Sequence, residues 1–249
     1  MIIVNRKNKG ITVSNIWYAK EPIKQAGIHY YYEALQPIGQ NATPFRTLLT
    51  DLTKSEEEIT AKYTRTTKYE IRRAAKEGVQ GTIIYGDEVT DADIEELCEF
   101  LHQFWASKGR SEMTVEVIHK QIRDYVEAKR FCITKAFVDG KTIVYHTYIQ
   151  GDDFMRLFHS ASLFRIDIDR SNRLIGRANR YLHQLEIQGF KEKGYKILDW
   201  GGAGLEEEVA SITRFKAEFG GEVANYYNGV EIVGLWPKFA TKLLSILHR

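Results

Sequence analysis

The feature that most constrains the fold of this chain is a run of three strand patterns followed by a helix and one more strand. Asp139-Gly140 favours a two-residue hairpin turn between the first two strands, and Gly151-Asp152-Asp153 turns into the third. A helix between two strands of one sheet requires a crossover, so the third and fourth strands should be parallel neighbours. The expected ranges are strands 131–138, 142–150, 154–163 and 196–200, with the helix over 178–190.

The rest of the chain alternates strand and helix patterns. Ser55 and Glu58 have capping-box spacing at the start of a long helical pattern that should end at Gly78. Other expected helices cover 91–108, 115–129 and 206–219, and a last one opens at Pro237. Other expected strands cover 11–19, 29–35, 47–52 and 81–85, with a strand-turn-strand over 223–233 through Asn228-Gly229. These patterns predict an α+β (α/β) fold with a mixed, mostly antiparallel sheet flanked by helices. We expect a β-rich segment over 1–53 packed on a domain over 54–249, or one continuous domain.

Composition excludes several functional classes. The 249 residues carry a net charge of +2 and are 43% hydrophobic, which is ordinary for a globular protein, so any phosphate affinity must come from local clusters. No apolar run is long enough to span a bilayer, and the N-terminus lacks a signal-peptide pattern, which favours the cytoplasm. Cys98 and Cys132 have apolar neighbours and should be buried thiols, and the seven histidines show no metal-ligand spacing.

One hexapeptide between the third strand and its helix favours phosphate binding. It reads Arg173-Leu174-Ile175-Gly176-Arg177-Ala178, and Arg170 and Arg180 flank it. A loop leading into a helix N-terminus offers backbone N–H groups and a positive dipole to an anion, and arginines can pair with its oxygens. Four arginines there are unfavourable for the helix dipole unless an anion offsets them, although a solvated basic face is the plain alternative.

The spelling Arg-x-x-Gly-x-Ala resembles the pyrophosphate loop of the GNAT acyltransferases, which hold acyl-coenzyme A. The resemblance implies that the pantetheine arm lies between strands 154–163 and 196–200, in a groove where these parallel strands splay apart. It also implies acyl-CoA as co-substrate, with acetyl-CoA first among the donors. The implied cofactor-binding residues are Arg173, Leu174, Ile175, Gly176, Arg177, Ala178, Phe158 and Ser160.

A second set of motifs resembles the Fem family, the bacterial peptidoglycan-bridge aminoacyltransferases built from GNAT-like domains. The set comprises Asp199-Trp200-Gly201-Gly202, the segment Phe215–Gly221, the basic helix 63–79 and Asp139-Gly140-Lys141. The resemblance runs from about residue 48 to 227 and implies substrate contacts by Trp200, Gly201, Gly202 and Arg72. It also implies that Lys216 neutralises negative charge near the acyl group. Family members are usually longer and contain two GNAT-like units. A solvated face is the default alternative for the basic helix, and a simple turn is the alternative for the glycine pair.

Attack by an amine on a thioester requires a proton acceptor, and the leaving thiolate can require an acid. Asp199 is the first candidate base and His159 the second, while Tyr226 or Tyr227 could supply the acid. Each has a structural alternative: a capping aspartate, a core histidine and sheet aromatics. With no Ser or Cys nucleophile elbow in the sequence, direct transfer is favoured over a covalent intermediate.

Three hypotheses follow. The first is an N-acyltransferase that moves an acyl group from acyl-CoA to a small-molecule or peptide amine without a metal. The second is a Fem-like aminoacyltransferase that uses aminoacyl-tRNA to modify a peptidoglycan precursor or peptide. The third is a non-catalytic GNAT-like ligand-binding domain. We expect a monomer or homodimer in each case.

Overall fold

The fold was analysed in a computed structural model, which describes residues 1–163, 172–204, 207–235 and 237. The chain divides into two compact units, one formed by residues 1–47 with 223–249 and the other by 48–222. The domain boundary expected after residue 53 stays a prediction. The expected helix opening at Pro237 falls largely on residues outside the described ranges.

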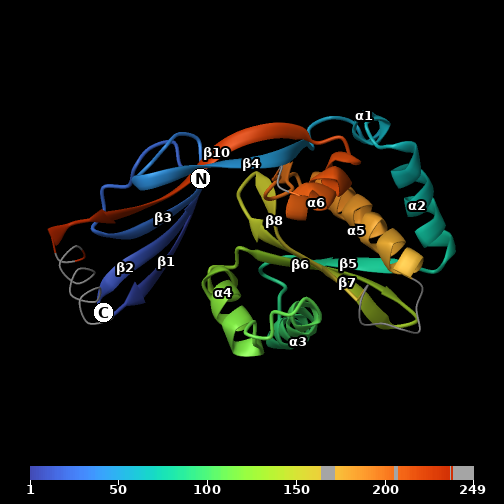
Figure 1. The fold of residues 1–249 in the computed structure, drawn as a ribbon, viewed down its shortest axis with the longest axis horizontal. Helices are drawn as coiled ribbons and strands as arrows, with labels where there is room; N and C mark the ends of the chain where they lie inside the picture. The colour runs from blue at the N-terminus through green and yellow to red at the C-terminus, as the bar shows by residue number, and fades with distance from the viewer. Residues whose placement is uncertain (164–171, 205–206, 236, 238–249) are drawn as a thin grey trace. The chain divides into compact units, whose positions relative to one another are not determined.

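The first unit is a small sheet. Its strands are β1 (Ile2–Asn8), β2 (Ile11–Trp17), β3 (Gly27–Ala34) and β10 (Glu222–Val233), and β4 (Gln40–Asp51) begins here (Figure 1). β1 and β2 form an antiparallel hairpin, β2 and β3 are parallel, and β3 and β10 are antiparallel. The hairpin β1–β2, which the sequence analysis missed, turns at Lys9 and Gly10, both with positive φ.

β10 corrects one expectation, because the strand runs through Asn228-Gly229 without turning back. A bulge falls between Tyr227 and Gly229, and the Asn228 Oδ1 accepts a hydrogen bond from the Glu33 backbone N–H at 2.8 Å. A Cβ on Gly229 would lie 2.1 Å from the Ile38 carbonyl oxygen. The glycine therefore serves a close approach of two backbones rather than a hairpin turn.

The second unit contains a mixed sheet in the order β4-β9-β8-β7-β6-β5. The new strands are β5 (Gln80–Ile84), β6 (Phe131–Val138), β7 (Lys141–Gln150), β8 (Phe154–Ser162) and β9 (Ile197–Asp199). The hairpin at Asp139-Gly140 is confirmed, with φ of 50° and 74° at its two residues. The expected parallel pairing of β8 with β9 is also confirmed, whereas the other pairs from β5 to β8 and β4 with β9 are antiparallel.

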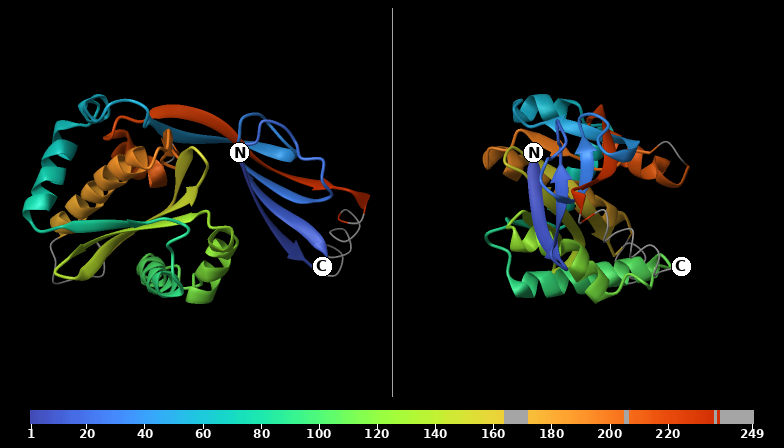
Figure 2. Two further views of the ribbon diagram at one scale, coloured as in Figure 1. Left: turned by 180° about the vertical axis from the view of Figure 1, so that it is seen from behind. Right: turned by 90° about the vertical axis from the view of Figure 1, so that its left-hand side faces the viewer.

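The helices of this unit are α1 (Glu56–Ala61), α2 (Arg65–Lys76), α3 (Asp91–Ser107), α4 (Val115–Glu127), α5 (Asn172–Glu192) and α6 (Glu207–Ala217). α5 lies on one face of β5–β8 with α2 packed against it, while α3 and α4 cover the other face (Figures 1 and 2). No helix within the described ranges is both long and apolar enough to cross a membrane.

The expected helix over 55–78 is two helices. Ser55 and Glu58 form the capping box of α1, as expected. α2 then starts anew because the Thr64 side chain accepts the Thr67 N–H, and the Thr64 N–H donates to the Glu218 carbonyl at 2.9 Å. A threonine that caps a helix competes with helix continuation through it, and the bond to Glu218 favours the break.

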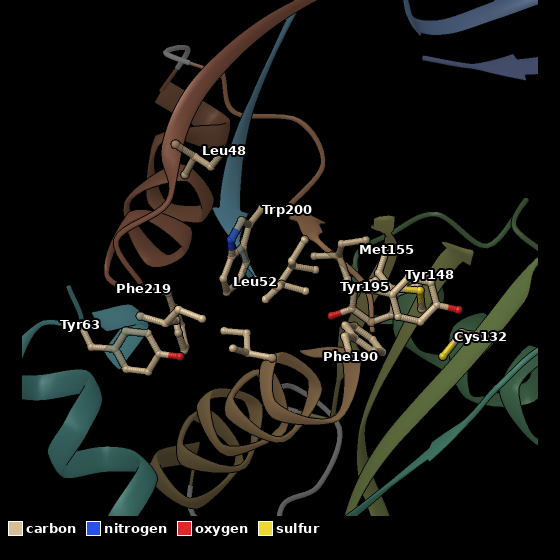
Figure 3. Packing of buried hydrophobic residues seen from close by; sticks show 14 of the residues in the cluster. Leu48, Leu52, Tyr63, Cys132, Tyr148, Met155, Phe190, Tyr195, Trp200 and Phe219 are labelled. Carbon is tan, nitrogen blue, oxygen red and sulfur yellow. The ribbon is translucent and has the colours of Figure 1, made fainter. Parts of the chain in front are cut away.

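A cluster of buried side chains joins α5 to the sheet (Figure 3). Trp200, Phe219 and Tyr63 gather at one end, and Phe190, Tyr195 and Tyr148 at the other. Cys132 belongs to this cluster and Cys98 is buried in α3, so both expected buried thiols are confirmed. Aromatic packing of this extent holds the end of β9 and the end of α6 firmly against α5.

Candidate active site at the separation of strands β8 and β9

The parallel pairing of β8 with β9 covers three residue pairs and then ends. Phe154, Met155 and Arg156 lie opposite Ile197, Leu198 and Asp199. β9 ends at Asp199, whereas β8 continues to Ser162 in its pairing with β7. β9 therefore pairs with β8 no further than Arg156, and the Leu157 carbonyl beyond it lies close to Gly201.

A bulge lies directly beyond this separation. Thr147 of β7 faces His159, but the next residue, Tyr148, faces Leu157, so Phe158 is inserted without an opposite residue. A bulge interrupts the hydrogen-bond ladder and re-aims the side chains around it. The Phe158 ring is tilted against His159 at 4.4 Å and against Tyr125 at 5.7 Å, while Ser160 is exposed.

The end of β9 is a tight turn. Asp199 is fully buried, and its Oδ1 accepts the Gly201 N–H at 2.7 Å. Gly201 has φ of +61°, and a Cβ there would lie 2.7 Å from the Leu157 carbonyl oxygen. This glycine is therefore required by both its backbone conformation and its contact with β8. Asp199 caps the turn, which was the structural alternative expected for this residue. Its role as a base stays a prediction.

Lys216 of α6 closes this turn from the other side. Its Nζ donates to the carbonyl oxygens of Gly201 at 2.5 Å and Gly202 at 2.9 Å. Gly202 is exposed and Lys216 is half-buried, so a positive charge lies at the accessible end of β9. These contacts with the two carbonyl oxygens give Lys216 a structural role that does not depend on packing between the flanking phenylalanines.

His159 lies on the bulged segment of β8. Its Nδ1 is 2.9 Å from the Thr147 Oγ1, which also accepts the His159 backbone N–H at 3.1 Å. Burial, with a smaller effect of the Arg156 charge, lowers the pKa of His159 to about 4. The imidazole is consequently neutral at neutral pH and able to accept a proton.

The hexapeptide 173–178 is helical, which corrects the expected loop and the expected helix start at Ala178. It belongs to the first turns of α5, and residues 164–171 before it lie outside the described ranges. Ile175 and Ala178 are fully buried, Leu174 is half-buried and Arg173 is exposed. A Cβ on Gly176 would meet no described atom within 4 Å.

Two arginines of this segment are matched by carboxylates. Arg177 pairs with Glu70 at 2.7 Å and with Glu77 at 2.8 Å, both on α2. The hydrogen bonds that Arg177 donates to these two glutamates raise its pKa further. Arg180 pairs with Glu218 at 2.8 Å and lies over the Phe215 ring at 4.8 Å. These ion pairs offset the unfavourable arginine charge near the helix start. From the sequence, a bound anion was expected to provide this compensation.

The remaining candidate residues are a core tryptophan, an exposed arginine and a tyrosine of the other compact unit. Trp200 is completely buried, and its Nε1 donates to Thr50 at 2.9 Å, so its indole is a core side chain rather than a surface for substrate. Arg72 is exposed on α2. Tyr226 belongs to the other compact unit, where its ring meets Tyr18 edge-on at 5.5 Å.

The sequence analysis missed a buried polar cluster under this site, formed by His146, His183 and Glu186. His183 and Glu186 are separated by one helical turn and point inward from α5, and His146 points to the same face from β7. The sequence contained a signal for this cluster, because polar residues at these positions interrupt the apolar faces of both elements. Only the packing of α5 on β7 shows that these polar residues belong to one cluster.

The strand order, the bulge and the parallel pair that separates define the fold as GNAT-like, with Fem-like relatives. No protein-family model matches the sequence, and no curated protein is similar to it in sequence. The solved structures provide the relationship. FemX matches with a TM-score of 0.63 at 9% identity, over 96% of this chain and 85% of that chain.

Two further structures share the fold. The C-terminal domain of a putative lysylphosphatidylglycerol synthetase from Agrobacterium fabrum matches with a TM-score of 0.51 at 12% identity, over 98% of this chain and 85% of that chain. L-PGS from Bacillus licheniformis matches with a TM-score of 0.51 at 11% identity, over 88% and 72% of the two chains. At these identities the likeness establishes the fold.

Proposed function

We propose that this protein is an N-acyltransferase that moves an acyl group from acyl-CoA to an amine by direct attack. The observation that carries the proposal is the separation of β8 from β9 beside the Phe158 bulge. An extended pantetheine arm can pair with the strand edge that β9 leaves, and backbone N–H groups around the bulge can polarise the thioester carbonyl. FemX has the same fold, and so does the C-terminal domain of the putative lysylphosphatidylglycerol synthetase, whose name denotes aminoacyl chemistry.

The proposed reaction is balanced without a metal. The amine nitrogen forms a bond to the carbonyl carbon, the carbon–sulfur bond breaks, and the thiolate leaves. His159, neutral at neutral pH, accepts the amine proton directly or through water, and Asp199 is the second candidate. Lys216 adds a positive charge near the developing oxyanion.

The diphosphate of the donor is proposed to bind at the start of α5, beside Arg173 and Gly176. Arg173 is exposed, and a Cβ on Gly176 would meet no described atom within 4 Å. Arg177 and Arg180 would contribute mainly by shaping this end of the helix, because both are held by carboxylates.

Thermal unfolding with added acetyl-CoA tests the donor. At a ligand concentration 100 times its Kd, binding stabilises the folded state by about 2.7 kcal/mol. We expect a rise in Tm for the wild type and loss of that rise in the double variant Arg173→Ala, Gly176→Asp. Absence of any rise with acetyl-CoA and longer acyl-CoAs would contradict the proposal.

One observation favours aminoacyl-tRNA as a second candidate donor. Arg65, Lys68, Arg72 and Lys76 recur along one stripe of α2, and Tyr69 beside them is 51% exposed. A stripe of this kind suits a nucleic-acid backbone, with tyrosine available for stacking. This donor predicts RNA binding that weakens steeply between about 50 and 200 mM salt. Binding should also be weaker in the Arg72→Ala, Lys76→Ala variant. Absence of RNA binding at low salt would contradict this second candidate.

A further inference from the structure

A buried carboxylate with four hydrogen-bond donors lies between α5 and the sheet. Glu186 is completely buried. Its Oε1 accepts from the Thr134 hydroxyl and, at 2.7 Å, from the His146 Nδ1. Its Oε2 accepts from the Tyr148 hydroxyl at 2.5 Å and from the His183 Nδ1 at 2.8 Å. Burial opposes ionisation, but electrostatic interactions and hydrogen bonds with the two histidines outweigh it and keep the pKa of Glu186 well below its usual range.

The cluster is a product of strand alternation and helical spacing. His146 and Tyr148 are two residues apart on β7 and therefore point to the same face, toward α5, while Tyr145 points to α3 and contacts Phe100. Thr134 lies opposite His146 in the β6–β7 register. His183 and Glu186 lie three residues apart on the inward face of α5.

The donor set resembles that of a zinc site, but its geometry does not. The ligand atoms of the two histidines and Glu186 lie within 4.8 Å of one another. However, the His146 and His183 rings are stacked at 4.1 Å with an interplanar angle of 23°. Planes so nearly parallel meet far beyond the 2.0–2.1 Å of a Zn–N bond, so both rings cannot hold one ion in plane. The His146 Nε2 is also 2.8 Å from the Asn179 Oδ1.

His183 connects this cluster to the candidate active site. On one side its ring stacks on His146, and on the other it lies 4.8 Å from Trp200, 5.7 Å from Phe215 and 5.5 Å from Phe219. Trp200 directly precedes the Gly201-Gly202 turn, and the two phenylalanines flank Lys216. The imidazole thus contacts both segments that meet where Lys216 donates to the glycine carbonyls.

We propose that His183, oriented by Glu186, is a positioning residue for the candidate active site. The Nδ1–H bond to Glu186 fixes the ring orientation, so that the ring packs between Trp200 and the end of α6. This packing holds the Gly201-Gly202 turn and Lys216 at the distance at which the ammonium group reaches both carbonyls. This inference rests on the proposed function, because it assigns the cluster to the site where acyl transfer is proposed.

Titratable and charged groups surround His183. They are Glu186 on its own helix, His146 and Tyr148 on β7, and Lys216 on α6. Burial lowers the pKa of His183 to about 4, helped by the charges of His146 and Lys216 and opposed by Glu186. A neutral His183 does not repel the Lys216 ammonium, and the positive charge can therefore stay at the turn.

Three variants of the full chain separate positioning from simple stability. Glu186→Gln removes the charge at nearly constant shape, and His183→Asn keeps an N–H donor but removes the ring. Thr134→Val, the matched control, removes a donor to the same carboxylate on the side away from His183. Hydrogen–deuterium exchange is followed in peptides covering 200–204 and 213–220 without ligand, and ¹⁵N-histidine spectra report the tautomer of His183.

We expect both test variants to accelerate exchange in these two peptides at least tenfold and the control to stay within threefold of the wild type. The spectra should show His183 as the neutral Nδ1–H form, altered by Glu186→Gln and unaltered by Thr134→Val. Equal acceleration in all three variants, no acceleration in His183→Asn, or a stoichiometric change of the histidine signals with zinc sulfate would overturn the inference. A parallel titration with acetyl-CoA reports separately on the proposed function, because the exchange measurement needs no ligand.

Discussion

Replacing Gly176 with alanine should make the protein more stable and weaken its binding of acetyl-CoA. Gly176 lies inside α5, and a Cβ there would meet no described atom within 4 Å. Alanine is favoured over glycine in a helix interior by about 0.8–1.0 kcal/mol, and no clash offsets this gain. For a chain of this length, about 1 kcal/mol corresponds to a rise in Tm of roughly 2–4 °C.

The same methyl group would occupy the space in which the donor diphosphate is proposed to approach the helix backbone. We therefore expect the Kd for acetyl-CoA, measured by calorimetry, to rise at least tenfold, or about 1.4 kcal/mol. Stability and affinity would then change in opposite directions, which general damage to the fold cannot produce.

Gly189→Ala in the same helix is the matched control. Its Cβ would lie 2.5 Å from the Ile83 Cδ1, so Ile83 must move and the propensity gain should be smaller or reversed. Its effect on acetyl-CoA affinity should be below threefold. A stabilised Gly176→Ala variant with unchanged affinity would refute the assignment of Gly176 to the donor site, and a destabilised one would refute the helical environment described for it.

Three further outcomes are expected. Gly201→Ala should destabilise by about 2–4 kcal/mol in chemical denaturation, because φ of +61° and a backbone oxygen at 2.7 Å both oppose a Cβ, and a loss below 0.5 kcal/mol would contradict this. Arg177→Met should cost about 1–2 kcal/mol, because Glu70 loses its arginine partner and Glu77 keeps only Arg73. A second change, Glu70→Gln, should recover most of that loss. Stability should fall as the pH drops from about 6.5 toward 4. The pKa values of His159 and His183 are about 4 in the folded protein and 6.5 in the unfolded chain. The unfolded chain therefore binds more protons in that pH range, and acidification favours it. Denaturation midpoints that do not change over this range would contradict the neutral state of both rings.

Local patterns in the sequence were sufficient for most of the elements. The Asp139-Gly140 hairpin, the capping box at Ser55 and the amphipathic helices α3 and α4 follow from turn chemistry and periodicity, which act between residues close in the chain. The parallel pairing of β8 with β9 followed from the need for a crossover. The Fem-like and GNAT-like motifs correctly indicated the fold that FemX shares.

Only the tertiary structure decided which distant groups meet. Thr64 starts α2 as a separate helix because the Glu218 carbonyl accepts its N–H, and Gly229 permits a close approach to Ile38 instead of a turn. Arg177 faces carboxylates of α2. Such pairings depend on how helices and strands pack, and periodicity within one element carries no information about them.

The buried cluster around Glu186 is the clearest case. The sequence determines that His183 and Glu186 share a face of α5 and that His146 and Tyr148 share a face of β7. That these two faces meet, and that four donors converge on one carboxylate, is decided by packing of the helix on the sheet. A buried charge is tolerated only where its partners are assembled, and that assembly exists only in the folded chain.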